Sequence, residues 1–272
     1  MSPATHATGP LLRSWRARRR LSQMDLALDV GVSTRHLSFI ETGRSRPSPA
    51  MLMALSERLQ VPLRERNRLL LSAGYAPQFG EEKLDAPAMA PVRDALARLL
   101  AAHDPYPGLV LDGLYNIVQM NQSAARMMAI LPPALQTAPQ ASPLPNIIRL
   151  SLHPDGLAKH TTNFPDWAWY LLDTLGRQVQ QSADADLAAL QREVLAYPNV
   201  ARLMQLPRAA ATGAPALLVP CEMTFPFGRL SLFTTLSTFG TPRDITLAET
   251  SVEMFYPADA ASEALLRALA AA

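Results

Sequence analysis

The 272-residue sequence lacks several features that define other classes of protein. Cys221 is the only cysteine, so the chain cannot form an internal disulfide bond. Residues 1–8 show neither the cationic start nor the apolar run of a secretory signal. No apolar run approaches the roughly 20 residues that a helix needs to cross a bilayer. We therefore expect a cytoplasmic protein, and its length favours two domains over one.

The usual sequence patterns of catalytic, cofactor and metal sites are also missing. There is no phosphate-binding loop, dinucleotide fingerprint or Ser-His-Asp signature. His153 and His160 have neither a cysteine nor regularly spaced acids around them, so we expect no metal site. Cys221 lies beside Pro220 in an expected strand without an adjacent base, which favours a buried, inert thiol over a redox sensor. We therefore predict neither catalytic residues nor a resident cofactor.

Charge divides the chain into a basic part and an acidic part. Residues 1–80 contain 12 Lys and Arg against 5 Asp and Glu, whereas residues 81–272 contain 13 against 18. A polyanion such as DNA would bind the basic part.

The most specific local pattern is a pair of short helices joined by a glycine turn. Ser22 and Asp25 have the spacing of a capping box, so a helix begins at Gln23. Gly31 supplies the positive φ that ends this helix, and Ser33 caps the next helix at once. Two helices joined in this way form the helix-turn-helix unit that places its second helix in the major groove of DNA.

The outer face of this second helix is polar and cationic, with one aromatic residue. At about 100° per residue, Leu37 and Ile40 point inward. The outward-facing residues are Arg35, Ser38, Phe39 and Thr42. Gly43 ends the helix, and Arg44 and Arg46 follow it, where their charges can meet phosphate oxygens without reading the base sequence.

Three further helices and a linker complete the expected first domain. The helices span Pro10–Arg20, Pro47–Gln60 and Pro62–Ala73. Each has an apolar stripe, and together with the central pair they give a small all-helical core. We expect residues 1–8 to be a disordered tail, 9–75 the DNA-binding domain, and 76–91 a linker rich in proline, glycine and charge.

Residues 92–272 predict an α+β domain with an antiparallel sheet. An amphipathic helix ends near His103, and LVLD and YNIVQMN then form a hairpin. The later helices are expected at Ser123–Leu131, Ile147–Leu152, Phe164–Gln181, Asp184–Tyr197 and Asp259–Ala271, and the later strands at Leu217–Phe225, Gly228–Phe239 and Ile245–Tyr256. We expect the helices to cover one face of the sheet, with an apolar space beneath them.

Both halves of the chain resemble known families. The stretch LSQMDLALDVGVSTRHLSFIETGRSRPSPAMLMALSERLQV resembles the helix-turn-helix domain of Xre-type, lambda-repressor-like transcription regulators, which implies double-stranded DNA as a partner. In that family the glutamine that opens the second helix and the first residues of the third helix meet the DNA. Pattern and resemblance together imply these DNA-binding residues: Gln23, Ser33, Thr34, Arg35, Ser38, Phe39, Arg44 and Arg46.

The second half resembles the ligand-binding domain of MmyB-like transcription regulators, a PAS-like sensor fold. The matching blocks are PYPGLVLDGLYNIVQMNQSA, NIIRLSLHPDGL, NFPDWAWYLL and STFGTPRDITLAETSVEMFYPAD. This resemblance implies a bound fatty acid or a similar apolar ligand. A carboxylate head would need a cation, for which we choose Arg149 and His153, and the alternative is a structural ion pair of Arg149 with Asp155 or Asp166.

Met127 and Trp169 are the candidates for the apolar part of the ligand pocket. The methionines of this half suit an adaptable apolar pocket, and ordinary core packing is the alternative. Trp167 and Trp169 lie two positions apart on one expected helix, so one belongs to the core and the other lies near the surface or a pocket mouth.

The sequence therefore predicts a sequence-specific DNA-binding regulator, and not an enzyme, whose second domain senses a small apolar ligand. One helix-turn-helix domain covers too little of an operator for typical specific affinity, so we expect a homodimer. The alternative is that the second domain binds no ligand and serves dimerisation or protein interaction, which predicts a large exposed apolar patch in place of a cavity.

Overall fold

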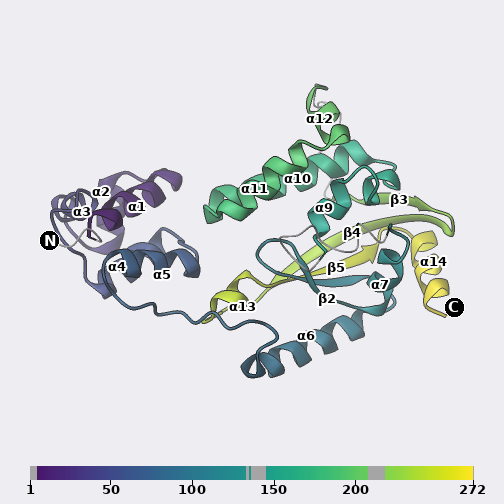
Figure 1. Cartoon of the computed structure of the whole chain (residues 1–272), viewed down its shortest axis with the longest axis horizontal. Helices are drawn as coiled ribbons and strands as arrows, with labels where there is room; N and C mark the ends of the chain where they lie inside the picture. The colour runs from purple at the N-terminus through teal and green to yellow at the C-terminus, as the bar shows by residue number, and fades with distance from the viewer. Residues whose placement is uncertain (1–4, 133–134, 136–144, 208–217, 272) are drawn as a thin grey trace. The chain divides into compact units, whose positions relative to one another are not determined.

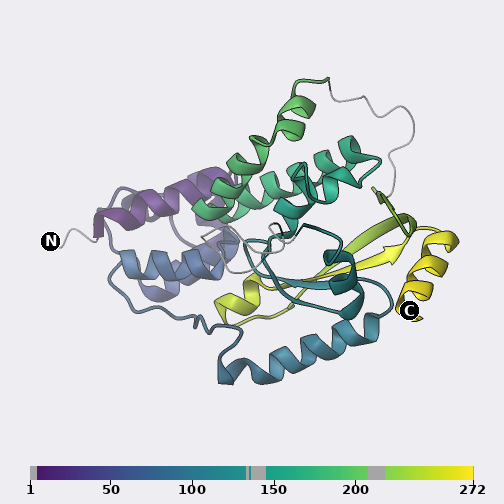
Figure 2. The same cartoon turned by 45° about the vertical axis from the view of Figure 1, so that its right-hand side comes forward.

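The computed structural model describes residues 5–132, 135, 145–207 and 218–271 (Figures 1 and 2). The chain divides into two compact units. One holds the chain up to Glu82 together with Gln180–Ser182 and Thr241–Ala248, and the other holds the rest. No helix in the described part of the chain has the length and apolar character needed to cross a bilayer.

Within residues 5–82 the first unit contains five α-helices. They are α1 (Thr5–Arg18), α2 (Gln23–Val30), α3 (Thr34–Glu41), α4 (Pro49–Arg58) and α5 (Leu63–Ser72). Their apolar stripes meet in a core in which Trp15, Leu26, Leu37, Ile40 and Leu69 expose at most 2% of their surface. The predicted all-helical domain is confirmed.

The central helices begin and end where the sequence predicts. The Ser22 hydroxyl accepts a hydrogen bond from the amide of Asp25, and the Asp25 side chain accepts one from the amide of Ser22, which completes the capping box of α2. Gly31 ends α2 with φ 75°, and the Ser33 hydroxyl then caps α3 by accepting from the His36 amide.

The predicted disordered tail at residues 1–8 is wrong for its described part, because α1 already begins at Thr5. Thr8 is 3% exposed, and its hydroxyl lies 2.9 Å from that of Ser72 on α5. A Cβ on Gly9 would lie 2.4 Å from the carbonyl oxygen of Glu41, so only glycine permits this approach of α1 to α3. Contacts with α3 and α5 thus extend the first helix beyond the residues that carry its apolar pattern.

The predicted linker at residues 76–91 is shorter in the structure. The buried side chain of Asn67 accepts hydrogen bonds from the amides of Gln78 and Phe79 and donates to the Phe79 carbonyl, which ties the start of this segment to α5. At its other end, Pro87–Met89 form a 3-10 turn and the next helix, α6 (Ala90–His103), begins at Ala90.

The second unit contains a five-stranded antiparallel sheet of order β2-β1-β5-β4-β3. The strands are β1 (Gly108–Leu111), β2 (Ile117–Met120), β3 (Cys221–Phe225), β4 (Gly228–Thr238) and β5 (Ser251–Pro257). The predicted hairpin and the predicted meander of the last three strands are both present. Leu217, the predicted start of β3, lies outside the described residues.

The last strand is shorter than predicted because α13 (Ile245–Glu249) occupies its expected beginning. The Asp244 carboxylate accepts a hydrogen bond from the Leu247 amide, which favours a helix start over an extended chain. Thr246 and the apolar residues around it suggest a strand by composition, and this local cap overrides that tendency.

Six more α-helices complete the described part of this unit. They are α7 (Gln122–Met128), α9 (Ile147–Leu152), α10 (Phe164–Ser182), α11 (Ala185–Leu195), α12 (Pro198–Met204) and α14 (Ala260–Ala271). All except α12 are predicted by the sequence. In α12, Pro198 stands at the first helical position, where its missing N–H costs nothing.

Helices cover both faces of the sheet, which corrects the expectation of one covered face. On one face Val110 and Val252 pack against Leu96 and Leu100 of α6. On the other face the apolar residues of β1, β3 and β4 share a larger core with α7, α9, α10 and α11. The unbroken burial of β1 agrees with two covered faces, because a strand that faced water on one side would alternate.

Candidate functional site

The outer face of α3 presents two arginines organised around one aromatic ring. Phe39 is half-buried, and the guanidinium carbons of Arg35 and Arg44 lie 5.3 and 5.9 Å from its ring centroid. Both arginines are exposed, and Ser38 lies on the same face. Cation–π contacts of this kind restrain long side chains without removing their charge from solvent. The structure therefore brings together the predicted base-reading residue Arg35 and the predicted phosphate contact Arg44.

The start of α2 is tied to the end of α3 through Glu41. The side chain of Glu41 is only 1% exposed, and it receives a two-fold hydrogen bond from Arg16 at 2.6 and 2.9 Å. The Gln23 amide donates to the same carboxylate at 2.8 Å. Burial alone would raise the pKa of Glu41, but the hydrogen bonds from Arg16 and Gln23 outweigh burial and hold that pKa below its ordinary value. Gln23 is thus held in place by a buried ion pair.

The other predicted DNA contacts lie at the two ends of α3. Thr34 is exposed at its first turn, and Ser33 is also exposed, although its hydroxyl is engaged in capping. Arg46 is exposed as well, but it leans toward α5. Its guanidinium carbon lies 4.4 Å from the Tyr75 ring centroid, and it donates to the Gly74 carbonyl at 3.3 Å. Of the predicted phosphate contacts, Arg44 therefore lies closer to the exposed face of α3.

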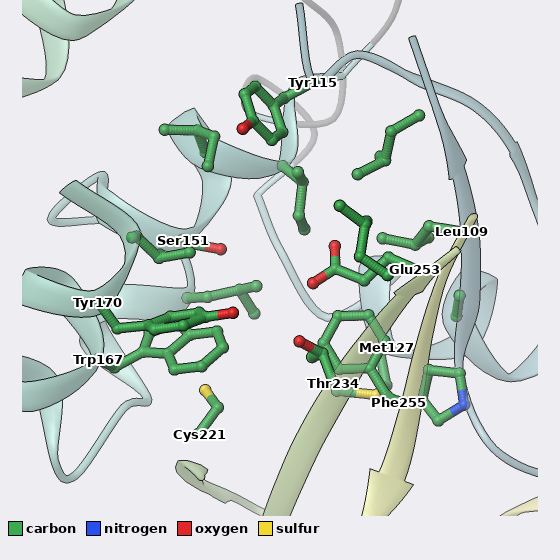
Figure 3. Close-up of a pocket in the computed structure, with 18 of the residues that line it drawn as sticks. Leu109, Tyr115, Met127, Ser151, Trp167, Tyr170, Cys221, Thr234, Glu253 and Phe255 are labelled. Atoms are coloured by element: carbon green, nitrogen blue, oxygen red, sulfur yellow. The ribbon is translucent and has the colours of Figure 1, made fainter. Parts of the chain in front are cut away.

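A cavity of about 130 Å³ lies within the second unit, between the sheet and helices α7, α9 and α10 (Figure 3). Leu109, Met127, Trp167, Met223 and Phe255 contribute much of its apolar lining. Met127 lies where the sequence predicts a pocket residue. The Trp167 ring also stacks on Tyr170, with centroids 5.2 Å apart, so one wall of the cavity is a pair of aromatic rings.

Three predicted pocket residues lie outside this lining, and those predictions are wrong for this cavity. Arg149 forms a two-fold ion pair with Glu193 of α11, with both N–O distances at 2.8 Å. His153 packs edge-on against Tyr197 at 5.2 Å, and its Nδ1 accepts from the Asp155 amide. The Glu193 pairing raises the pKa of Arg149, so this cation is structural, and its partner is neither of the acids considered from sequence.

The two tryptophans differ in burial as expected, but Trp167, and not the predicted Trp169, lines the cavity. Trp167 is 4% exposed and lines the cavity, whereas Trp169 is half-buried and packs elsewhere on the core. The inward stripe of α10 runs through Trp167, Leu171 and Leu175. Trp167 and Trp169 lie on two different apolar stripes of α10. Only the elements that pack against α10 decide which of these two stripes is buried.

The polar groups of the cavity are those that sequence reasoning missed. Glu253 of β5 lines it together with the hydroxyl-bearing residues Tyr115, Ser151, Tyr170 and Thr234 (Figure 3). Burial raises the pKa of the Glu253 carboxyl to about 7, and a hydrogen bond from Thr234 opposes part of that rise. The signal in the sequence is an acid in the alternating strand SVEMFYP, where Val252 and Met254 suggest the buried face and so place the acid in solvent.

Cys221 also borders the cavity and is buried, as predicted. Burial raises the pKa of its thiol to about 12, so the thiol stays protonated near neutral pH. Among the residues that the structure describes, no three His, Cys, Asp or Glu side chains gather in a way that could hold a metal ion.

Two family models match the chain, one in each half. Residues 92–269 match the model of the MmyB-like transcription regulator ligand binding domain, and residues 12–66 match a helix-turn-helix model. Both resemblances drawn from the sequence are confirmed by these matches. Neither family description names an enzyme, and no curated protein matches the chain.

Two solved structures of a clp gene regulator, ClgR from Corynebacterium glutamicum, also resemble part of the chain. One is 28% identical, covers 27% of this chain and 92% of its own, and has a TM-score of 0.24. The other is 26% identical, covers 38% of this chain and 97% of its own, and also has a TM-score of 0.24. These low TM-scores support no conclusion about the fold.

Proposed function

The chain belongs to the MmyB-like transcription regulators, and from this membership we propose a cytoplasmic, sequence-specific regulator whose second domain senses a small apolar ligand. The protein is a DNA-binding transcription regulator with a ligand-binding domain. We propose in addition that it reads a specific DNA sequence, binds an apolar ligand and acts as a dimer.

The observation that carries the DNA-reading proposal is the exposed face of α3. Arg35 stands in its first turn, and Thr34 and Ser38 flank it with short polar side chains. An arginine in this position of a recognition helix can donate two hydrogen bonds to one guanine edge, which distinguishes base pairs in the major groove. Arg44 follows the helix and supplies charge for phosphate oxygens, which fixes position and adds affinity.

We propose that two copies of the chain read the operator together. A single recognition helix contacts one half-site, and paired half-sites give the contact area that specific regulators need. Analytical sedimentation of the protein with and without a two-fold symmetric operator tests this proposal. Two copies of the chain on each operator are expected, and one copy would contradict it.

The cavity supports the ligand proposal over the alternative of a ligand-free interaction module. That alternative requires a filled interior, whereas the described part of the second unit encloses about 130 Å³ between the sheet and α10. A fatty acid remains the candidate implied by the resemblance. Its chain would lie against Leu109, Met127 and Trp167.

Regulation requires that the ligand bind with different affinity to the DNA-bound and free forms of the protein. Native mass spectrometry of the purified protein, followed by denaturation and identification of any released molecule, tests for the ligand. Titration of a selected operator with and without that molecule then measures the coupling directly. Equal operator affinity in both titrations would contradict the sensing role.

The test of DNA reading compares two arginine variants on operators selected from random sequence. Arg35→Ala is expected to lose discrimination by about 1–3 kcal/mol at the base pair it reads. Arg44→Ala is expected to weaken binding to all sequences about equally and to reduce the salt dependence of binding by about one charge. If both variants weaken all sequences alike, α3 is not the reading helix.

A further inference from the structure

One carboxylate points into the largely apolar cavity of the second unit, which is otherwise bordered by hydroxyl groups as its polar lining. Glu253 lies opposite Leu109 of β1 and Leu236 of β4 in the strand register, on the sheet face that borders the cavity. Figure 3 shows its two oxygens directed into the space that Ser151 and Tyr170 border from the other side. A molecule that fills this space must therefore contact the carboxyl group.

The groups that face Glu253 supply no positive charge. Among the described residues that line the cavity, none is lysine, arginine or histidine. The other titratable groups there are Tyr115, Tyr170 and Cys221. Burial and the nearby charge of Glu253 raise the pKa of Tyr115, and burial raises that of Cys221 to about 12, so neither carries charge near neutral pH. Arg177 lies outside the lining.

A purely apolar ligand would leave this carboxyl with only the hydrogen bond from Thr234 after water is displaced. Burial of a polar group without a partner is unfavourable, and burial of an unpaired charge is more so. A ligand with a positively charged hydrogen-bond donor removes the cost, because the donor and the carboxylate neutralise each other. A ligand carboxylate would instead place a second anion in the same apolar space.

We propose that the cavity binds a small hydrophobic amine, with its apolar part against Met127 and Trp167 and its ammonium group donating to Glu253. The hydroxyl groups of Ser151 and Thr234 are placed to accept the remaining ammonium hydrogens. This inference rests on the proposed ligand-sensing function and names an amine in place of the fatty acid that the resemblance implies. The cavity is close in size to the engineered one of about 150 Å³ that holds benzene, so it fits a single ring or a short chain.

The pairing also sets the direction of the pH dependence. The pKa of about 7 for Glu253 means that the carboxyl is largely protonated below that pH in the empty cavity. An ammonium ligand favours the ionised carboxylate, so its affinity rises as the pH rises through 7. A carboxylic acid ligand binds best when a proton remains between the two acids, so its affinity falls over the same range.

The test uses the full-length protein and three probes of similar shape, which are phenethylamine, phenethyl alcohol and hydrocinnamate. Calorimetric titration at pH 8 is expected to show tightest binding for the amine. Glu253→Gln is expected to reduce amine affinity by about tenfold to a hundredfold, the usual value of a hydrogen bond to a charged group, and to leave the alcohol nearly unchanged. Glu263→Gln, an acid on α14 that pairs with Arg267, is the control and should change neither.

Each outcome decides between the ligand class and the sensing function. Equal or tighter binding of hydrocinnamate, or amine binding that Glu253→Gln does not weaken, overturns the amine and leaves ligand sensing intact. Failure of all three probes to bind overturns the amine, and the native mass spectrometry described above decides ligand sensing separately. If Glu253→Gln does not fold, the pH dependence of amine binding to the natural protein replaces it, and an affinity that falls between pH 6 and pH 8 overturns the proposal.

Discussion

The buried pair of Arg16 and Glu41 makes a prediction about the stability of the DNA-binding unit. Arg16→Met keeps most of the side-chain volume and removes both hydrogen bonds from the guanidinium to the carboxylate. The carboxylate of Glu41 then stays in a site where its side chain is 1% exposed, with one hydrogen bond left from Gln23. The variant therefore isolates the cost of an incompletely paired buried charge.

The expected magnitude follows from the exposure of the two partners. Breaking a buried pair by removing one partner costs about 3–5 kcal/mol. The side chain of Arg16 is 14% exposed and that of Glu41 is 1% exposed, so solvent screens the pair only weakly. The remaining hydrogen bond from Gln23 offsets part of the loss. We therefore expect Arg16→Met to lower the free energy of unfolding by about 3 kcal/mol at pH 7, the lower end of this range.

The pH dependence has a definite sign. In the natural protein the pKa of Glu41 lies below the ordinary 4.5, so the pair contributes fully above that value and is lost as the pH falls through the lowered pKa. In the variant, burial without Arg16 raises the pKa of the same carboxyl. As the pH falls, the Glu41 carboxyl therefore becomes protonated at a higher pH in the variant than in the natural protein. Protonation removes the unpaired buried charge of the variant and so reduces its loss of stability. The difference in stability should shrink as the pH falls from 7 toward 4.

The assay is denaturant unfolding followed by the fluorescence of Trp15, in a Trp167→Phe, Trp169→Phe background so that the first unit alone is observed. Arg58→Met is the matched control, because Arg58 and Asp29 pair at 2.6 Å with side chains 46% and 34% exposed. An exposed pair is worth about 0–1 kcal/mol. Equal losses of stability for the two variants at pH 7, or a loss for Arg16→Met that does not shrink in acid, would contradict a stabilising buried pair.

Three further predictions test the contacts described above. Gly9→Ala should lower the melting temperature of the first unit although alanine favours helices by about 0.5–1 kcal/mol, because its Cβ would lie 2.4 Å from the Glu41 carbonyl oxygen; a higher melting temperature would contradict that packing. Arg149→Met should cost about 1 kcal/mol of stability, since Glu193 is partly exposed, and leave ligand affinity unchanged in calorimetry; loss of binding would return Arg149 to the pocket. Cys221 should react with an aromatic disulfide reagent at pH 8 only after unfolding, because its pKa is about 12, and rapid reaction in the native protein would refute the inert thiol.

The first unit could be predicted closely because its signals are local. A capping serine and its acid are three residues apart, Gly31 meets the need for positive φ by itself, and each helix carries its own apolar stripe. The outward position of Arg35 on α3 follows from helix geometry alone. What the sequence could not supply was the early start of α1, because Thr8 and Gly9 are ordered by contacts with Ser72 and Glu41.

The second unit was predictable in its elements and less so in its pairings. The five strands and most of the helices follow from periodicity and breaks, yet the ion-pair partner of Arg149 lies 44 positions away on another helix. No spacing rule selects Glu193 over the acids nearer in sequence. The choice between Trp167 and Trp169 depended in the same way on which side of α10 meets the sheet.

The position of Glu253 depends partly on the sequence and partly on the tertiary structure. The alternation of Val252, Glu253 and Met254 in β5 is visible in the sequence, and it determines that the acid lies on the opposite face from its two apolar neighbours. That pattern places the acid in water only when a single face of the sheet is buried and the other face is exposed to solvent. Because α6 packs beneath Val252 while α9 and α10 cover the other face, both faces are enclosed, and Glu253 lies in the cavity.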